Sequence, residues 1–283
     1  MTKQKSISST SRENVIEKIY PLADDYMFTA VMQHKDACKR LLEAIFGKGK
    51  ISRIEYQDPE VQKSIRFRPN SKGVRLDVFI EGEDVAYNVE LQNANKEGLF
   101  KRARFYSSML DSYMTKRGAK YSELKKSYVI FICTFDPYLE GDTLYELEWT
   151  VKGKPHLNGR DEQYRIFMNT RGSNRGISDE LEELFRYINE GSSAVGSVAE
   201  RDSLTGLLDS YVVRLNEDNG WKGERMKYEC DMADSFNEGE AKGESKERSR
   251  IVKAMYSDGL SAEKISQYAS IPVEQVQSIL QDQ

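Results

Sequence analysis

Two neighbouring runs of alternating apolar and polar residues, at positions 74–80 and 85–92, constrain the fold of this chain more than any other feature. Runs of this length that are rich in Val, Ile and Tyr, with a period of two, are typical of β-strands. A connection of only four residues, 81–84, separates them. The sequence therefore predicts an antiparallel hairpin at the centre of the chain's first half.

The short connection sets the expected register of this hairpin. If Ile80 faces Val85, then Asp77 lies opposite Asn88 and diagonal to Glu90. Diagonal neighbours on paired strands are about 7–8 Å apart at Cα. That spacing is close enough for the two carboxylates to meet at one cation.

Side chains alternate between the two faces of a strand, so the hairpin has one apolar and one polar face. The polar face carries Arg75, Asp77, Asn88, Glu90 and Gln92. Two carboxylates gathered on one face need a compensating partner, and a hard divalent metal ion supplies it. The alternative is a sheet whose polar face is open to solvent, where such residues are ordinary.

The remaining patterns predict an α/β fold. A helix begins after a candidate N-cap at position 24 or 25, reaches residue 46 and stops at Gly47. Further helices are expected at 97–117, ending near Gly118, and at 179–189. Strands are expected at 128–133, a continuous apolar run typical of a strand buried on both faces, and at 144–151 and 163–168.

A change of composition marks the expected domain boundary near residues 191–197. Beyond it only helical patterns rich in Glu and Lys remain, with i,i+4 pairs such as Glu238–Lys242. We therefore divide the chain into a loose tail at 1–20, an α/β domain at 21–195, a charged helical connector at 196–250 and a small helical module at 251–283.

The charges are distributed unevenly along the chain, although the formal net charge is only -4. Residues 61–76 hold five basic side chains and no acid, and residues 96–126 hold nine basic side chains against three acids. Residues 178–247 hold 18 acids against eight basic side chains. A basic front half is the usual sign of a polyanion-binding face, although solvated helix surface would give the same counts.

Cysteine and histidine usage limits the possible chemistry. Three widely spaced cysteines, Cys38, Cys133 and Cys230, predict neither a disulfide framework nor a zinc site and indicate a reducing cytosol. With only His34 and His156, a His-based metalloenzyme or a Ser-His-Asp hydrolase is disfavoured. No run approaches the roughly 18 apolar residues of a membrane helix. We therefore expect a cytoplasmic protein in which carboxylates carry any catalysis.

Five blocks of the sequence resemble one known family. They are Leu22-Ala-Asp-Asp-Tyr-Met-Phe28, Arg75-Leu-Asp77, Val89-Glu-Leu-Gln92, Lys101-Arg-Ala-Arg-Phe-Tyr106 and Tyr128-Val-Ile-Phe-Ile-Cys-Thr-Phe-Asp136. Asp77-x₁₂-Glu90-x-Gln92 is similar to the PD-(D/E)XK signature, and the block order more closely resembles the Rpn family of recombination-promoting nucleases, also described as transposases. The resemblance runs from about residue 20 to 190. It implies a restriction-endonuclease-like core, with a mixed central sheet flanked by helices, and an all-helical C-terminal extension.

The same resemblance implies DNA endonuclease activity in bacteria that depends on Mg²⁺ (or Mn²⁺). Asp77 and Glu90 match the metal-ligand positions, which the Leu91 carbonyl completes. Gln92 takes the place of the Lys that usually steers the attacking water. An amide can hydrogen-bond water but has no charge and no useful basicity. We therefore expect Gln92 to orient the nucleophile, and a Gln92→Lys variant to retain or raise activity.

Further residues are candidates, each with an ordinary alternative. Asp24 or Asp25 matches an outer-shell acid on the family's first helix, but either would also serve as the helix N-cap. Candidate DNA contacts are Arg75, Lys101, Arg102, Arg104 and Tyr106. For the aromatic residues of this helix, packing in the core is the common alternative to stacking on bases.

Residues 260–280 resemble a helix-turn-helix, with Ser261 as a cap and Ser270 where the turn would prefer Gly. The second helix holds no Lys or Arg. DNA reading is therefore disfavoured, and a module for packing or self-association, hence a homo-oligomer, is preferred. Two functions stay open: a DNA endonuclease serving recombination, mobile elements or phage defence, and a catalytically silent DNA-binding or self-associating relative that keeps the fold.

Overall fold

The computed structural model describes residues 18–47, 60–65, 74–173, 176–193 and 203–281. It divides the chain into two compact units, residues 1–218 and 219–283. Most of the predicted N-terminal tail lies outside the described residues, but its end is anchored. The backbone N–H and C=O of Tyr20 bond to the side-chain amide of Asn216, both at 2.9 Å.

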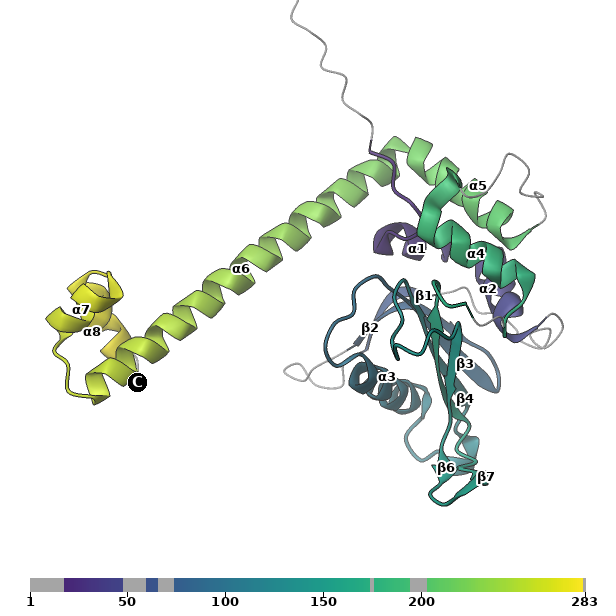
Figure 1. The fold of residues 1–283 in the computed structure, drawn as a ribbon, viewed down its shortest axis with the longest axis horizontal. Coiled ribbons are helices and arrows are strands. Elements are labelled where there is room, and N and C mark those ends of the chain that lie inside the picture. The colour runs from purple at the N-terminus through teal and green to yellow at the C-terminus, as the bar shows by residue number, and fades with distance from the viewer. Residues whose placement is uncertain (1–17, 48–59, 66–73, 174–175, 194–202, 282–283) are drawn as a thin grey trace, which may run out of the picture. The chain divides into compact units, whose positions relative to one another are not determined.

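A six-stranded sheet forms the centre of the first unit (Figure 1). Its strand order is β1-β2-β3-β4-β8-β5. Neighbours β3, β4 and β8 run parallel, whereas β1, β2 and β5 pair in antiparallel fashion. The bounds are β1 Glu60–Ile65, β2 Val74–Glu81, β3 Val85–Gln92, β4 Lys126–Cys133, β5 Leu144–Leu147 and β8 Gln163–Asn169. The predicted mixed sheet of an α/β fold is confirmed.

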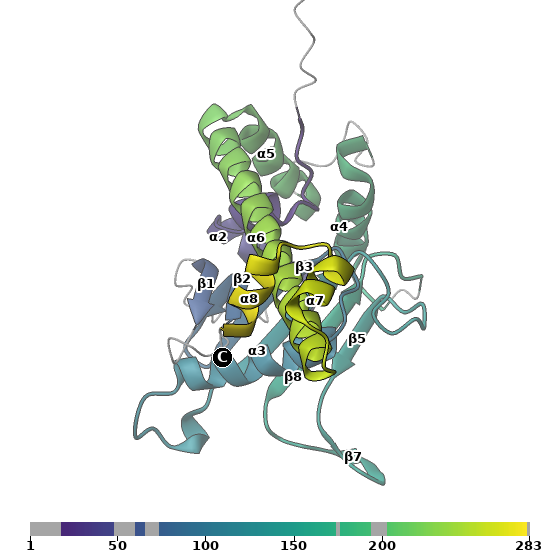
Figure 2. The ribbon, with the colours of Figure 1, turned by 90° about the vertical axis from the view of Figure 1, so that its left-hand side faces the viewer.

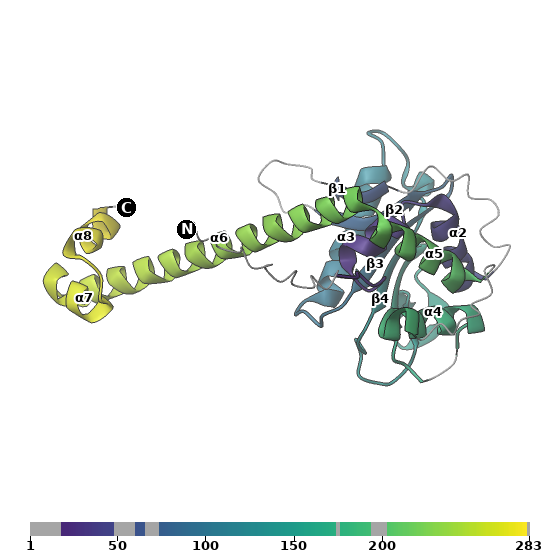
Figure 3. The ribbon, with the colours of Figure 1, turned by 90° about the horizontal axis from the view of Figure 1, so that it is seen from above.

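Helices cover both faces of this sheet (Figure 3). One face carries α3, Leu99–Met114, where the rings of Phe131 and Phe167 stack at 5.5 Å beneath it. The other face carries α1 Asp25–Val31, α2 Lys35–Phe46, α4 Asp179–Glu190 and α5 Leu204–Glu217. On that side Phe46 packs against Tyr87 and Tyr128, whose rings stack at 5.3 Å. Each face therefore has its own aromatic layer.

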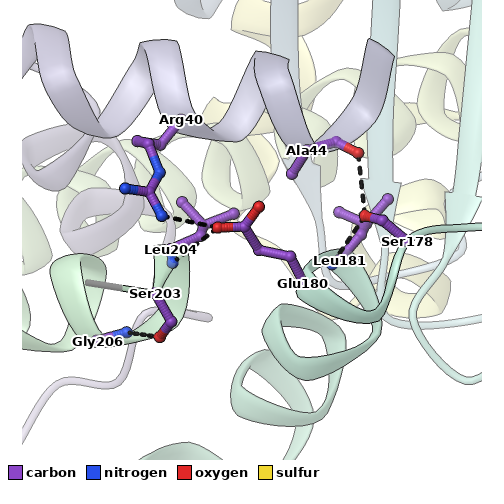
Figure 4. A network of polar contacts seen from close by, with 8 residues as sticks. All are labelled: Arg40, Ala44, Ser178, Glu180, Leu181, Ser203, Leu204 and Gly206. Atoms are coloured by element: carbon purple, nitrogen blue, oxygen red, sulfur yellow. Dashed lines mark hydrogen bonds and ion pairs between the residues drawn. The ribbon is translucent and has the colours of Figure 1, made fainter. Parts of the chain in front are cut away.

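Glu180 of α4 ties three helices together (Figure 4). Its Oε1 accepts hydrogen bonds from Arg40 Nη2 of α2 at 2.8 Å and from the backbone N–H of Leu204 at the start of α5 at 3.1 Å. Ser178, the N-cap of α4, donates to the carbonyl of Ala44 at 3.3 Å. This network explains why the first unit continues through α5 to residue 218. The boundary predicted at 195/196 falls among residues 194–202, outside the described ranges.

The helix predicted from residue 25 to 46 is in fact two helices. After Val31 the chain makes a tight turn in which the His34 N–H donates to the Val31 carbonyl at 3.1 Å. The thiol of Cys38 caps this turn by donating to the Met32 carbonyl at 3.0 Å. The second helix stops at Gly47 as predicted, where the backbone adopts φ 96.

A two-stranded ribbon, β6 Thr150–Val151 and β7 Lys154–Asn158, leaves the sheet after β5 (Figure 2). The single strand predicted for residues 144–151 was therefore wrong, because the chain leaves the sheet at residue 148. The ribbon is closed at its base by the Gly159 N–H, which donates to the Trp149 carbonyl at 2.5 Å. A Cβ on Gly159 would lie 2.6 Å from the Trp149 Cβ, so this crossing requires glycine.

The second unit is wholly helical and consists of α6 Asn219–Ser257, α7 Ala262–Ala269 and α8 Val273–Gln281. The boundary predicted at 250/251 falls inside α6, which is continuous. Ser261 caps α7 as predicted, by accepting a hydrogen bond from the Lys264 N–H, and Ser270 takes the left-handed conformation of the turn at φ 51. None of the described helices is both long and apolar enough to cross a lipid bilayer.

A small apolar core joins α7 and α8 to the end of α6. It buries Val252, Ile265, Ile271 and Val276. Of the seven apolar residues behind the predicted self-association, Ile265, Ile271 and Val276 are buried in this core, and Met255, Leu260 and Leu280 pack against it. The module therefore covers most of this surface without a second copy, while Ile251 stays exposed. Self-association itself stays a prediction.

Candidate active site

The hairpin that carries the predicted site has a different register from the predicted one. Glu81 pairs with Ala86 and Val78 pairs with Val89. Continuing this register places Asp77 level with Glu90, so the predicted pairing of Asp77 with position 88 was wrong. The difference is two residues, and an even shift leaves every side chain on its predicted face.

The polar face of the hairpin is not open to solvent, because α3 covers it. Asn88, Glu90 and Gln92 are 0%, 5% and 8% exposed, and Asp77 is half-buried. The alternative of an ordinary solvated face is therefore wrong. Buried polar and charged groups are costly unless they find partners, so their partners indicate what this face is built to do.

Glu90 is held through one of its two carboxylate oxygens. Its Oε1 accepts hydrogen bonds from the backbone N–H of Asp77 and from Asn88 Nδ2, both at 3.0 Å. The carboxylate of Asp77 in turn accepts the backbone N–H of Leu91. Because the N–H and C=O of one strand residue point to the same edge, the Leu91 carbonyl is directed to the side where Asp77 lies. The Asp77 carboxylate, the Glu90 carboxylate and the Leu91 carbonyl therefore lie at the junction of these two strands.

The pKa of both carboxyl groups is raised, and burial is the largest cause in each case. Desolvation raises the pKa of Asp77, and the negative charge of Asp25 adds to the rise. Desolvation likewise raises the pKa of Glu90, and the charge of Asp77 adds to it. Such a pair is relieved by a positive charge placed between the carboxylates.

A cleft of about 740 Å³ opens over this pair. Nine of the eleven predicted site residues line it: Asp25, Arg75, Asp77, Glu90, Leu91, Gln92, Lys101, Arg102 and Tyr106. Sequence reasoning missed other lining residues, among them Asn93, Ala94 and Lys96. The available signal was adjacency, because Asn93 and Lys96 directly follow the strand that ends at Gln92.

The two acids at the start of α1 have different roles. Asp24 is the N-cap, because its Oδ1 accepts the backbone N–H groups of Tyr26 at 3.1 Å and Met27 at 2.9 Å. Asp25 lines the cleft, and its Oδ1 accepts a hydrogen bond from Asn93 Nδ2 at 2.9 Å. The capping alternative therefore holds for Asp24, and the placement expected of an outer-shell acid holds for Asp25.

Gln92 is engaged at both ends of its amide. Its Oε1 accepts a hydrogen bond from Arg102 Nη2, and its Nε2 donates to the Ala94 carbonyl. Arg102 lies in the first turns of α3, which starts after Gly98 in the left-handed conformation at φ 85. The guanidinium carbon lies 5.0 Å from the ring centroid of Phe131. Arg102 is therefore directed inward, toward the sheet.

The other predicted DNA contacts divide into rim and core. Lys101 and Arg75 are exposed at the edge of the cleft. Arg104 is exposed but does not line the cleft. The ring of Tyr106 belongs to the core beneath α3 and packs on Phe131, which is the packing alternative rather than a free stacking surface. Three further basic residues of the predicted basic stretch, at positions 66, 68 and 72, lie outside the described residues.

The donor set suits a hard divalent cation. Carboxylate and carbonyl oxygens are the ligands that Mg²⁺ and Mn²⁺ prefer. Within the described ranges, no group of three or more His, Cys, Asp or Glu side chains is placed to hold a metal ion. Asp77 and Glu90 would therefore share the ion with the Leu91 carbonyl and water, and Mg²⁺ usually keeps several waters.

The mixed sheet flanked by helices, in which half-buried Asp77 lies level with the Glu-x-Gln segment, has the architecture of the PD-(D/E)XK nuclease fold. Residues 22–152 match the family model of the PD-(D/E)XK nuclease family transposases. The match agrees with the resemblance to the Rpn nucleases, and the matched segment contains every predicted site residue. No curated protein and no solved structure gave a match.

Proposed function

We propose that this protein is a metal-dependent DNA endonuclease, and that residues 21–195 form its nuclease domain. The observation that carries the proposal is the pair of half-buried Asp77 and buried Glu90 in a cleft whose rim bears cationic side chains. The match of residues 22–152 to the family model of the PD-(D/E)XK nuclease family transposases supports the same conclusion.

The residues divide the work by position. Asp77, Glu90 and the Leu91 carbonyl would hold Mg²⁺ or Mn²⁺. When bound, the ion supplies Lewis acidity toward the scissile phosphate and lowers the pKa of a water molecule. Asn88 and the Asp77 N–H hold Glu90 Oε1, which leaves Oε2 to face the cation. Gln92 orients the attacking water through its remaining amide hydrogen.

The rim of the cleft fits a phosphodiester backbone. Arg75, Lys96 and Lys101 line it, and cationic side chains supply most of the sequence-independent affinity for DNA. These exposed cations would attract the DNA phosphates to the rim of the cleft, and their charge would offset the repulsion between the phosphates and the carboxylates of Asp77 and Glu90. This arrangement supports DNA as the substrate.

Supercoiled plasmid offers a direct test of the reaction. Wild-type protein should nick it only when Mg²⁺ or Mn²⁺ is added, and Asp77→Asn should not nick it at any metal concentration. A matched control is Asp84→Asn, an exposed acid in the turn of the same hairpin, which should cleave like wild type. Cleavage by the wild type in excess EDTA, or by Asp77→Asn in Mg²⁺, would contradict the proposal.

The alternative is a silent relative that binds DNA or itself without cleaving. The observation that favours it is the amide at position 92, which lacks the charge of the usual Lys. Metal-independent DNA binding together with an absence of nicking over the whole metal titration would select this alternative.

Self-association through the C-terminal helices is a further part of the proposal. Exposed apolar side chains remain on α6, namely Met226, Met232, Phe236, Ile251 and Tyr256. Removal of residues 236–283 should then lower the number of copies per particle, obtained from the mass measured by light scattering, and change DNA affinity little. An unchanged number of copies with a large loss of salt-sensitive DNA affinity would contradict it.

We also propose that the protein acts in the bacterial cytoplasm, with a role in recombination, mobile elements or phage defence.

A further inference from the structure

The geometry points to Arg102 as a positioning residue that supplies, through Gln92, the positive charge that Lys brings to this place in the PD-(D/E)XK pattern. The inference rests on the proposed nuclease function and deepens it. It also revises the sequence-based role of Arg102, which was a contact to DNA phosphates.

The orientation of the Gln92 amide follows from its two partners. A guanidinium can only donate hydrogen bonds and a backbone carbonyl can only accept them. Since Arg102 Nη2 contacts one end and the Ala94 carbonyl contacts the other, the Gln92 oxygen must face Arg102. The amide is thereby polarised by a cation at one end, and Gln92 and both of its partners line the cleft.

Arg102 is held in place more firmly than a rim cation. Its guanidinium lies over the rings of Phe131 and Tyr106, at 5.0 Å and 5.9 Å from their centroids. Its Nε is buried and has no hydrogen-bond partner within the described residues. Leaving a buried donor unsatisfied is costly, and a contact to a surface phosphate would not require it. Lys101, one residue earlier on the same helix, is exposed at the rim instead.

The charge of Arg102 reaches both carboxylates of the site. Burial raises the pKa of Asp77 and of Glu90, and Arg102 is among the groups that oppose this rise in each case. Arg102 thus acts on both carboxylates and is hydrogen-bonded to Gln92, the residue that stands where the PD-(D/E)XK pattern has Lys. It therefore supplies the positive charge that this Lys would otherwise bring. Fixed charges directed at the reacting group are among the largest contributions to catalysis.

This arrangement changes the expectation for substitutions at position 92. A Lys there would place an ammonium against the guanidinium of Arg102, and like charges in contact are unfavourable in a partly buried site. Gln92→Lys alone should therefore lower activity, contrary to the expectation from the sequence. The same Lys should help once Arg102 no longer carries a charge.

Four proteins test the inference: wild type, Arg102→Gln, Gln92→Lys, and the double variant Gln92→Lys with Arg102→Gln. Loss of one preorganised donor costs about 10²–10³ in kcat. We therefore expect Arg102→Gln to nick plasmid about 100-fold more slowly, with KM for DNA little changed. The double variant should recover to within about tenfold of wild type, because the charge returns from a neighbouring position. Lys101→Gln is the comparison for a rim contact and should raise KM instead.

Binding of Mn²⁺ without DNA, measured by calorimetry, provides a readout that does not depend on cleavage. Removing a cation near the carboxylates should make Arg102→Gln bind Mn²⁺ more tightly than wild type, and the double variant should return toward the wild-type affinity. Arg102→Met, which keeps an apolar stem over Phe131, replaces Arg102→Gln if the latter does not fold.

Two results would overturn the inference. The first is a double variant as slow as Arg102→Gln. The second is an Arg102→Gln variant that loses only DNA affinity, with a salt slope smaller by about one, as expected of a single phosphate contact. If the wild type does not cleave at all, the proposed function fails, and the order of Mn²⁺ affinities decides the role of Arg102 separately. Equal affinities in all four proteins would then reject it.

Discussion

Replacement of Glu90 by Gln should make the metal-free protein more stable, by an amount that grows with pH. Gln has nearly the same shape and keeps an acceptor oxygen for the Asp77 N–H and the Asn88 amide, but it carries no charge. Burial, together with the charge of Asp77, raises the pKa of Glu90. The ionised carboxylate is therefore less favourable in the folded protein than in the unfolded chain.

The sign and the size of the effect follow from proton linkage. Because the pKa of Glu90 is raised in the folded state, its stabilising contribution is complete below the ordinary Glu pKa of about 4.3. It is lost as pH rises toward the folded-state pKa. Burial together with the charge of Asp77 raises the pKa of Glu90 to about 8, and a difference of one in pKa corresponds to about 1.4 kcal/mol. The advantage of Glu90→Gln should therefore be about 4–5 kcal/mol near pH 8 and below about 1 kcal/mol near pH 4.5.

Guanidinium denaturation in EDTA, at several values between about pH 5 and pH 8, measures this difference. Glu83→Gln, an exposed acid in the turn of the same hairpin, is the matched control and should show no gain that depends on pH. Added Mn²⁺ should reverse the order, because only the wild type keeps both carboxylate ligands. A gain of equal size at every pH, or a loss of stability at pH 8, would refute the reasoning.

Three further perturbations test other parts of the site. Asp77→Asn should abolish metal-dependent nicking but keep or raise DNA affinity in EDTA, since it removes a negative charge from a DNA-binding cleft; a fall in fluorescence-anisotropy affinity would contradict this. Asn88→Leu should lower the free energy of unfolding by about 1–3 kcal/mol and slow cleavage, because Glu90 Oε1 loses a partner; wild-type behaviour in both assays would exclude that role. Of the three cysteines only Cys230 is exposed, and burial raises the pKa of the Cys38 and Cys133 thiols to about 12. Mass spectrometry after alkylation of the native protein should therefore find one modified thiol, and modification of all three would contradict this burial.

Strand parity made the candidate site predictable from the sequence. The alternation in the two strands places Asp77, Glu90 and Gln92 on one face. A register error of two residues does not change this face, whereas an error of one residue would. The register itself could not be read, because a four-residue connection fits both pairings. The structure chooses the turn in which the Gly82 N–H donates to the Val85 carbonyl at 2.7 Å. Nothing in the composition of residues 80–86 distinguishes that turn from the predicted one, in which Ile80 would face Val85.

Elements that depend on tertiary contacts were less predictable. Residues 61–65 fall in the predicted basic stretch, but residues 60–65 form strand β1, which pairs with β2 at the end of the sheet. The break between α1 and α2 has no Gly or Pro to announce it. It is held by the thiol of Cys38. The contact between Arg102 and Gln92 depends on how α3 lies across the sheet, and helical periodicity gives no information about that angle.

The hydrogen bond that the Asp77 N–H donates to the Glu90 side chain gives Glu90 a structural role beside its proposed role in catalysis. In most hairpins a backbone carbonyl would satisfy that N–H, and a catalytic acid could later be replaced by any small residue once its activity was no longer selected. Here an Ala at position 90 would leave the N–H unsatisfied inside the protein, at a cost of about 1–3 kcal/mol. A lineage that loses cleavage should therefore retain Glu or pass to Gln at this position. Inactive descendants would then still resemble working nucleases at the residue that matters most for catalysis.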